Sequence, residues 1–340
     1  MIPVPKRVPT FSPAAVSLFL SGFFKVEKIM DELSLYGTDL FGDPIKPRAS
    51  GVVAQRFTLP PFSLLDSRQG EWQERKRAWL SLGLKSDEGR DDAYCYRGAI
   101  STDDFMGSEM AKIGSAVSVF DPVVCELAYR WFCPKGGQIV DPFAGGSVRG
   151  IVAGALAMNY WGCDLREEQI AANNKQADLI ETAIRPQWVC GDSMVKMDEA
   201  PEADFVFSCP PYGDLEVYSE NPNDLSNMDY HVFIAAYKRI ILRSVKVMKE
   251  DTFAAFVVGD FRDKKGFYRN FVSETIDGFE QAGAKLYNEA ILATSVGSAA
   301  MRVTKQFETG RKMAKTHQNM LVFCKGDWRK ATAKINAAGG

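Results

Sequence analysis

The sequence predicts an α/β protein built on a mostly parallel, doubly wound sheet. From about residue 137 onward, short apolar runs of strand type alternate with helical patterns. Such alternation is typical of βαβ units, whose strands run parallel. The first of these runs are continuously apolar, as expected for strands that are buried on both faces. Acidic or Gly-rich turns follow several of the strands, and the carboxyl ends of strands are where such sheets bind ligands.

Seven strands are predicted, and they lie at Gln138–Asp141, Tyr160–Asp164, Gln187–Cys190, Ala203–Phe207, Thr252–Val258, Lys285–Ala293 and Asn319–Lys325. Four helical stretches lie between them, at Val148–Met158, Arg166–Thr182, Tyr230–Lys249 and Phe267–Ala282. The region before this alternation lacks the strand-and-helix pattern and contains Pro-rich turns and charged stretches. We therefore expect an N-terminal extension at 1–115, a main domain at 116–328 and a flexible tail at 329–340.

Composition indicates an ordinary globular protein. The 41 basic and 43 acidic residues give a net charge of −2, and 46% of the chain is hydrophobic. These values exclude a disordered chain and a strongly basic coat protein. Seven scattered cysteines without a CxxC pair argue against a disulfide framework or a zinc site. Reduced thiols are therefore expected, as in a cytoplasmic protein. No apolar run has the ~20 residues of a membrane helix, so no membrane partner is expected. The oligomeric state stays open between a monomer and a homodimer.

The segment from Gly137 to Gly150 has the pattern of a strand, a Gly-rich turn and a helix. It does not match the dinucleotide fingerprint, because Ser147 stands where a glycine is required. It does not match the phosphate loop either, because Ile151 replaces the obligatory lysine. Asp141 at the mouth of the turn would repel a phosphate but suits a cationic ligand. S-adenosylmethionine, which carries an ammonium and a sulfonium group, is such a ligand.

Two more acids end the next two predicted strands. Asp164 is placed to accept hydrogen bonds from ribose hydroxyls, as an acid at this position does in related sheets. Asp192 follows the third strand, where it would accept from an adenine amino group. Each aspartate could instead cap a helix. Acids at the ends of three successive strands favour a ligand site.

Two consecutive prolines, Pro210 and Pro211, come directly after the fourth predicted strand. Prolines end the hydrogen-bonding ladder of a strand and stiffen the backbone. They would aim the Cys209 side chain, the Pro210 carbonyl and the Tyr212 ring into the crevice above the sheet. A Pro-Pro turn with a packing tyrosine is the purely structural alternative.

With these motifs the sequence resembles the amino-group DNA methyltransferases, and above all the phage-encoded DNA methylases. The shared phrases extend over residues 60–327 and include DPFAGGSVRG, SCPPYGDLEVYS and VVGDFRDKKGFYRNF. The resemblance implies a Rossmann-like class I methyltransferase fold, a seven-stranded sheet whose last strand is antiparallel. It also implies S-adenosylmethionine as cofactor, S-adenosylhomocysteine as product, and methyl transfer to an exocyclic amino group of a base flipped out of double-stranded DNA.

The resemblance also implies roles for individual residues. The catalytic residues would be Cys209, Pro210, Pro211 and Tyr212, and no metal is expected. The cofactor would be bound by Phe120, Asp121, Asp141, Phe143, Ala144, Gly145, Gly146, Asp164, Leu165, Asp192, Ser193 and Ser208. The family usually has Asp, Asn or Ser where this chain has Cys209, a weak hydrogen-bond acceptor. Adenine N6 is favoured over cytosine N4 as the target, and both stay open.

Other functions are compatible with the same motifs. An RNA base or a protein glutamine amide is the alternative substrate, and a non-catalytic DNA-binding protein on a methyltransferase scaffold is the alternative of another class. Covalent methylation at cytosine C5 through Cys209 is disfavoured, because in that chemistry the proline normally precedes the cysteine. A phage origin would place the protein in the cytoplasm of a bacterial host, in the context of DNA methylation or restriction–modification.

Two basic segments are candidate contacts with DNA. Phosphate contacts are predicted for the insertion before the last strand, through Arg302, Lys305, Arg311, Lys312 and Lys315. Residues 68–85 carry Trp72 and Trp79 at helical spacing, and we interpret them as an amphipathic helix docked on the main domain rather than as a DNA contact. Sequence selection is expected from the 213–228 loop, the 294–317 insertion or the N-terminal region. His231 and His317 are interpreted as local hydrogen-bonding residues.

Overall fold

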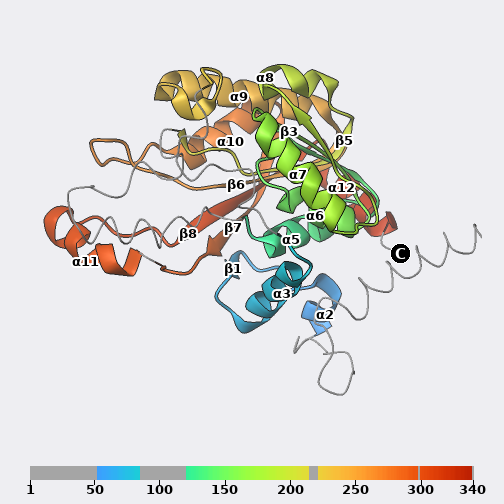
Figure 1. Cartoon of the computed structure of the whole chain (residues 1–340), viewed down its shortest axis with the longest axis horizontal. Coiled ribbons are helices and arrows are strands. Elements are labelled where there is room, and N and C mark those ends of the chain that lie inside the picture. Colours follow the sequence, from blue (N-terminus) through green and yellow to red (C-terminus); the bar gives the residue numbers. More distant parts are fainter. Residues whose placement is uncertain (1–51, 85–119, 214–220, 298, 339–340) are drawn as a thin grey trace, which may run out of the picture. The chain divides into compact units, whose positions relative to one another are not determined.

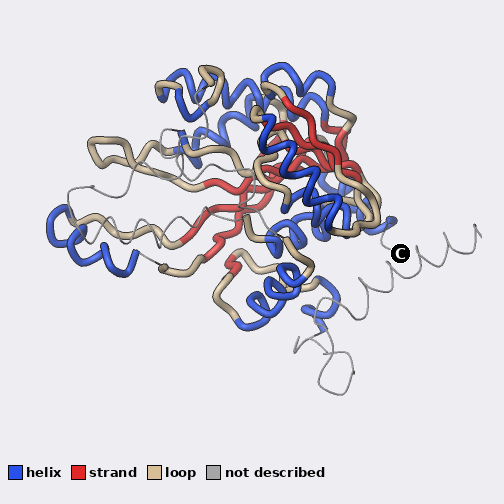
Figure 2. The backbone as a smooth tube through the Cα atoms, in the orientation of Figure 1, coloured by secondary structure: helices blue, strands red, loops and turns tan. Residues whose placement is uncertain are grey.

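The computed structural model describes residues 52–84, 120–213, 221–297 and 299–338. These residues belong to one compact unit that spans residues 48–340. Residues 1–51 and 85–119, which include most of the N-terminal extension predicted at 1–115, lie outside the described residues. In the described part the strands form a central layer with helices on either side of it (Figures 1 and 2).

The central layer is a single sheet with the strand order β1-β7-β8-β6-β5-β2-β3-β4. Its neighbouring strands are parallel except around β8, which is antiparallel to both β6 and β7. The predicted α/β class and the antiparallel last strand are therefore confirmed. The strands are β1 (Leu64–Asp66), β2 (Gln138–Asp141), β3 (Asn159–Asp164), β4 (Gln187–Cys190), β5 (Ala203–Ser208), β6 (Met248–Val258), β7 (Ala284–Ala293) and β8 (His317–Lys325).

The sheet has eight strands where seven were predicted, because β1 joins its edge. Leu64 of β1 lies opposite Ile291 of β7 in a parallel pairing. The Ser67 hydroxyl then donates a 2.8 Å hydrogen bond to the carbonyl of Ala293. A part of the predicted N-terminal extension is thus built into the sheet itself.

The helix after β1, α3 (Gly70–Ser81), docks on α5 (Pro122–Phe132) around one buried acid. Glu126 of α5 is fully buried and accepts hydrogen bonds from Arg75, from the Trp79 indole and from Arg130. Burial would raise the pKa of Glu126, but the two arginines and the indole outweigh it and hold the pKa below its ordinary value. The predicted docking of an amphipathic helix is confirmed.

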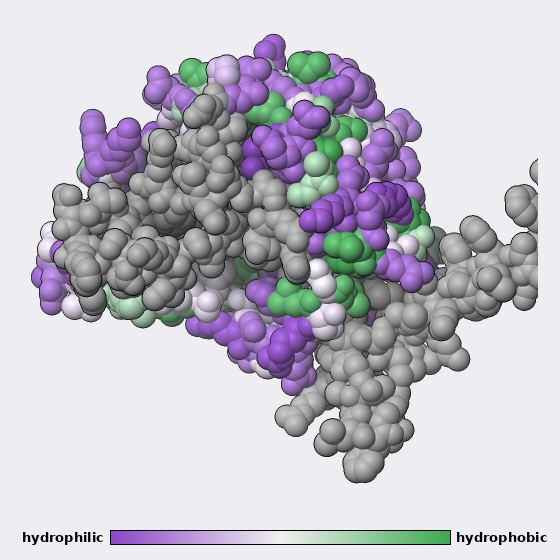
Figure 3. Space-filling model, in the orientation of Figure 1, coloured by the Kyte–Doolittle hydropathy of each residue, from purple (hydrophilic) through white to green (hydrophobic). Residues whose placement is uncertain are grey.

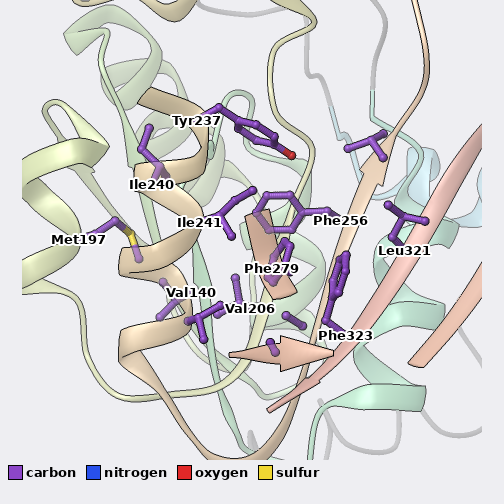
Figure 4. Close-up of a cluster of buried hydrophobic side chains, with 14 of the residues drawn as sticks. Val140, Met197, Val206, Tyr237, Ile240, Ile241, Phe256, Phe279, Leu321 and Phe323 are labelled. Atoms are coloured by element: carbon purple, nitrogen blue, oxygen red, sulfur yellow. The ribbon is translucent and has the colours of Figure 1, made fainter. Parts of the chain in front are cut away.

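The hydrophobic core lies between the sheet and the helices on one of its faces (Figure 4). Val140, Val206 and Phe256 from three strands meet Tyr237 of α9 there, and the rings of Phe279 and Phe323 stack at 3.9 Å between centroids. The remaining helices are α2 (Val52–Phe57), α6 (Val148–Ala155), α7 (Glu167–Leu179), α8 (Ser193–Lys196), α9 (Tyr230–Val247), α10 (Phe271–Gln281), α11 (Ala299–Gly310) and α12 (Trp328–Ala338). Among the described helices, none has the length and apolarity that crossing a membrane requires.

The predicted flexible tail at 329–340 is wrong for its described part, because residues 328–338 form α12. Ala331 is buried, and the Lys334 ammonium donates to the carbonyl of Glu250 at 2.6 Å. The small residues of this segment are mostly alanines, and alanine is the strongest helix former. Small side chains here favour a helix rather than a frayed tail, and one of them, Ala331, packs in the interior.

Candidate functional site

A pocket of about 480 Å³ lies at the carboxyl ends of the central parallel strands. Because these ends share one edge of the sheet, turns that are far apart in the sequence meet there. Thirteen of the sixteen residues predicted for catalysis or cofactor binding line this pocket: Phe120, Asp121, Phe143, Gly145, Gly146, Asp164, Leu165, Asp192, Ser193, Cys209, Pro210, Pro211 and Tyr212.

Asp141 does not face this pocket. Its side chain is fully buried, and one carboxylate oxygen accepts from Arg149 Nε at 2.5 Å and from the Tyr160 hydroxyl at 2.8 Å. The other oxygen accepts from the Ser208 hydroxyl at 2.5 Å and from the Phe143 amide at 3.0 Å. Because a buried carboxylate needs partners within the protein, Arg149 neutralises it. The prediction that Asp141 meets a cationic ligand is therefore wrong.

Arg149 of α6 is the structural residue that sequence reasoning missed. Its guanidinium donates to the carbonyls of Phe143 and Ala144 and lies 4.8 Å from the centroid of the Phe120 ring. Arg149 thereby ties the Gly-rich turn to the first turn of α6. Ala144 and Ser208 are fully buried and belong to the wall behind the pocket, not to its lining. The signal in the sequence is an arginine inside the otherwise apolar helix VRGIVAGA.

The two later acids both cap local structure and line the pocket. Asp164 accepts from the amide of Gly145 at 3.0 Å and from the amide of Arg166 at 3.0 Å. Asp192 is the N-cap of α8 and accepts from the amide of Met194 at 2.8 Å. The capping and ligand interpretations of these aspartates are therefore compatible, since a capping carboxylate can still present an edge to the pocket.

The β1–α3 segment forms one wall of the pocket, which the sequence did not reveal. Asp121, the N-cap of α5, accepts from the Trp72 indole at 3.1 Å and forms an ion pair with Lys76 at 3.1 Å. Lys76, Ser67 and Gln73 all line the pocket. The acidic side chain of Asp121 and the basic side chain of Lys76 thus lie next to each other in this wall.

The Tyr212 ring is held in a fixed orientation. The rings of Phe261 and Phe271 pack against it edge-on, at centroid distances of 6.2 and 6.0 Å. Gln318 of β8 donates a 2.6 Å hydrogen bond to the Tyr212 hydroxyl. Cys209, which directly precedes the two prolines, is half-buried at the pocket surface.

The predicted DNA-contacting residues lie on α11 and the chain that follows it. This insertion leaves β7 at the same edge of the sheet as the pocket, as expected (Figure 1). Lys305, Arg311 and Lys312 are exposed, whereas Lys315 is half-buried, and burial lowers its pKa. None of these four lines the pocket. The side chain of Arg302 and the whole 214–220 segment lie outside the described residues.

No protein-family model and no curated protein sequence matches the chain. Solved structures do match. TrmN from Thermus thermophilus is 14% identical over 63% of this chain and 51% of its own, with a TM-score of 0.41. A Thermus thermophilus protein provisionally assigned as a DNA modification methylase is 17% identical over 40% of this chain and 51% of its own, with a TM-score of 0.30. The chain thus spans about half the length of each.

A third similar structure is the magnesium protoporphyrin IX methyltransferase of Synechocystis with bound SAM. It is 9% identical over 66% of this chain and 86% of its own, with a TM-score of 0.39. Identities and TM-scores at this level assign no function to the chain. A functional conclusion has to come from the residues of the pocket.

Proposed function

We propose that the protein transfers a methyl group from S-adenosylmethionine to an exocyclic amino group of a base in double-stranded DNA, with adenine N6 ahead of cytosine N4. The observation that carries the proposal is the convergence of two motifs on one pocket. The Cys209–Tyr212 turn and the acids Asp121, Asp164 and Asp192 line the same space. Its volume of about 480 Å³ is within the range of small-molecule sites.

The lining fits the charges of the proposed cofactor. On the β3–β4 side, Asp164 and Asp192 offer carboxylates to a ribose diol and to an adenine amino group. On the β5 side, Asp121 and Lys76 form a pair of opposite charges 3.1 Å apart. Such a pair matches the ammonium and carboxylate of an amino-acid end. The cofactor carries those groups at the end remote from its adenine.

The chain's own residues would hold and orient the amino group. S-adenosylmethionine, when bound, supplies an electrophilic methyl group on its sulfonium. The Pro210 carbonyl and the Cys209 side chain would accept the amino hydrogens and so favour a pyramidal nitrogen with its lone pair directed at that methyl. The Tyr212 ring would stack on the flipped base. Most of the rate enhancement would come from positioning and electrostatics.

The proposal is tested by incubating the full chain with S-adenosylmethionine and unmethylated duplex DNA, followed by mass spectrometry of the nucleosides. N6-methyldeoxyadenosine is expected. N4-methyldeoxycytidine would keep the reaction class and change the base. A C5-methylated cytosine, or labelling of RNA or glutamine-containing peptides but not of DNA, would contradict the proposal.

A matched pair of variants ties the product to the pocket. Because stacking on an aromatic ring contributes about 1–3 kcal/mol per base, Tyr212→Ala should lower the transfer rate by about tenfold or more. Tyr212→Phe keeps the ring and should retain most of the activity. Tyr287→Ala is the control, since Tyr287 packs on Trp328 outside the pocket and should have no effect.

A further inference from the structure

The loop between β6 and α10, residues 259–270, leaves the sheet at the same edge as the pocket. Because β6 is parallel to β5, its carboxyl end lies beside the turn that carries Cys209. In Figure 1 this loop and the α11 insertion both project from that end of the sheet, at the left of the view. These two segments, which α10 and β7 separate in the sequence, therefore lie at the same end of the sheet as the pocket.

The β6–α10 loop is held together by its own hydrogen bonds. The amide of Asp263 donates to the carbonyl of Phe267 at 2.8 Å, and the Asp263 carboxylate accepts from the Phe267 amide at 2.9 Å. Arg262 donates to the carbonyl of Gly266 at 2.8 Å and lies 4.1 Å from the centroid of the Tyr268 ring. These contacts fix the direction in which the tip of the loop points.

The tip of the β6–α10 loop exposes cationic and aromatic side chains. Lys264 and Lys265 are exposed, and neither forms a salt bridge with any residue in the described part of the chain. Phe267 is 70% exposed. Figure 3 shows hydrophilic residues gathered at this projecting tip, at the upper left. An exposed aromatic ring beside unpaired lysines is typical of nucleic-acid-binding surfaces.

The loop also touches the α11 insertion. Lys312 lies over Gly266, where a Cβ atom would come within 2.8 Å of its Nζ atom. The Lys315 ammonium lies 5.8 Å from the centroid of the Tyr268 ring. The exposed cations of the loop therefore continue into those of the insertion. We call the exposed set Lys264, Lys265, Phe267, Lys305, Arg311 and Lys312 the basic rim.

We propose that the basic rim is one continuous binding surface for duplex DNA, in which the β6–α10 loop contributes phosphate contacts through Lys264 and Lys265 and an apolar base contact through Phe267. This inference rests on the proposed function for the identity of the partner. Charge complementarity favours a polyanion, and the position of the rim beside the pocket would deliver a nucleotide to Tyr212. No residue of the loop was among the predicted DNA contacts.

The test is fluorescence anisotropy of a labelled duplex of ~20 base pairs with the full chain and saturating S-adenosylhomocysteine, from 50 to 200 mM salt. Each phosphate contact contributes about 0.9 to the slope of log affinity against log salt, so Lys264→Gln/Lys265→Gln should reduce the slope by about two. Phe267→Ser should weaken binding at every salt concentration and leave the slope unchanged.

The matched control is Lys246→Gln/Lys330→Gln. These lysines are exposed on α9 and α12, at the edge of the sheet away from the pocket, and this variant should behave as wild type. Equal slopes for the rim variant and the control would overturn the rim proposal and leave the proposed function intact. Wild-type protein that binds no duplex at 50 mM salt would overturn both. Binding to vesicles with anionic lipid but not to duplex would show that the rim serves a membrane surface, which also overturns the proposal.

Discussion

The side-chain amide of Gln318 donates a 2.6 Å hydrogen bond to the hydroxyl of Tyr212. The bond connects β8, the antiparallel strand, to the turn that follows β5. The edges of Phe261 and Phe271 restrict the Tyr212 ring from two sides, and Gln318 anchors its hydroxyl. The ring that would stack on a substrate base is therefore oriented before any substrate arrives.

The Gln318–Tyr212 bond should appear as coupling between two variants. A typical hydrogen bond contributes about 1 kcal/mol to stability, so Gln318→Met and Tyr212→Phe should each lower the free energy of unfolding by about that amount. Because both remove the same bond, the double variant should lose about as much as either single one. Urea denaturation of the four proteins measures this, and strictly additive losses would show that the bond contributes nothing.

The ion pair between Asp141 and Arg149 should be essential to the Gly-rich turn. Breaking a buried pair from one side costs about 3–5 kcal/mol, since the remaining charge is left without a partner, and Arg149→Met should lower the free energy of unfolding by that amount. Asp141→Asn in the same chain should recover part of the loss.

The control for this pair is Arg185→Met. Arg185 forms an exposed ion pair with Asp178, and exposed pairs contribute about 1 kcal/mol at most. In urea denaturation, the loss of unfolding free energy should therefore be several-fold larger for Arg149→Met than for Arg185→Met. Equal losses would mean that Asp141 finds another partner when Arg149 is removed.

The docking of α3 on α5 should depend on pH through Glu126. The folded pKa of Glu126 lies below its ordinary value of 4.5, despite burial, because Arg75 and Arg130 stabilise the carboxylate. A lowered folded pKa contributes stability above the unfolded pKa, and this contribution is lost as the pH falls through the folded value. The stability advantage of wild type over Glu126→Gln should thus be constant near neutrality and shrink below about 4.5.

The measurement is urea denaturation of both proteins from pH 7 to pH 3. The difference between the two proteins isolates Glu126, because all other carboxylates titrate in both. An advantage that grows on acidification would mean that the folded pKa of Glu126 is raised, with burial outweighing the arginines.

Thiol labelling should report directly on the pocket. Cys190 is exposed and Cys209 is half-buried at the pocket surface, whereas Cys125, Cys133, Cys163 and Cys324 are buried. N-ethylmaleimide should therefore modify Cys190 and Cys209 ahead of the buried four. Desolvation and nearby acids raise the pKa of Cys190, which should slow its reaction relative to a free thiol.

Ligand protection then distinguishes the two reactive cysteines. S-adenosylhomocysteine should protect Cys209, which lines the pocket, and leave Cys190, which does not, as the internal control. Mass spectrometry of the peptides gives both rates from one sample. Equal labelling of Cys209 with and without the ligand would contradict the proposal that the cofactor binds beside the Cys209–Tyr212 turn.

The sequence was most informative where local chemistry decides structure. Apolar runs bounded by glycines, prolines and acids predicted seven strands to within a few residues, and because parallel strands end at one edge, their turns could be assigned to one site. It was uninformative about β1, whose three residues carry no periodicity and which is a strand because β7 pairs with it.

The direction in which an individual side chain points also could not be predicted from the sequence. Asp141 and Asp164 are the last residues of two neighbouring strands, β2 and β3, yet only Asp164 lines the pocket. The difference comes from Arg149 and Tyr160, which surround Asp141 from α6 and β3 and turn it into the wall. A partner brought by tertiary packing, rather than the position in the motif, decided the role of each acid.

The pairing of β1 with β7 has a consequence for how the protein is made. Ser67 and its hydrogen-bond partner Ala293 are separated by 226 positions in the chain. Contacts between such distant segments form late, because a long loop must close first. During synthesis, β1 cannot pair until β7 has left the ribosome, and by then most of the other strands of the sheet have already been made. The wall that carries Ser67 should therefore be the last part of the pocket to assemble, and we expect nascent chains that end before β7 to lack the proposed methyl-transfer activity.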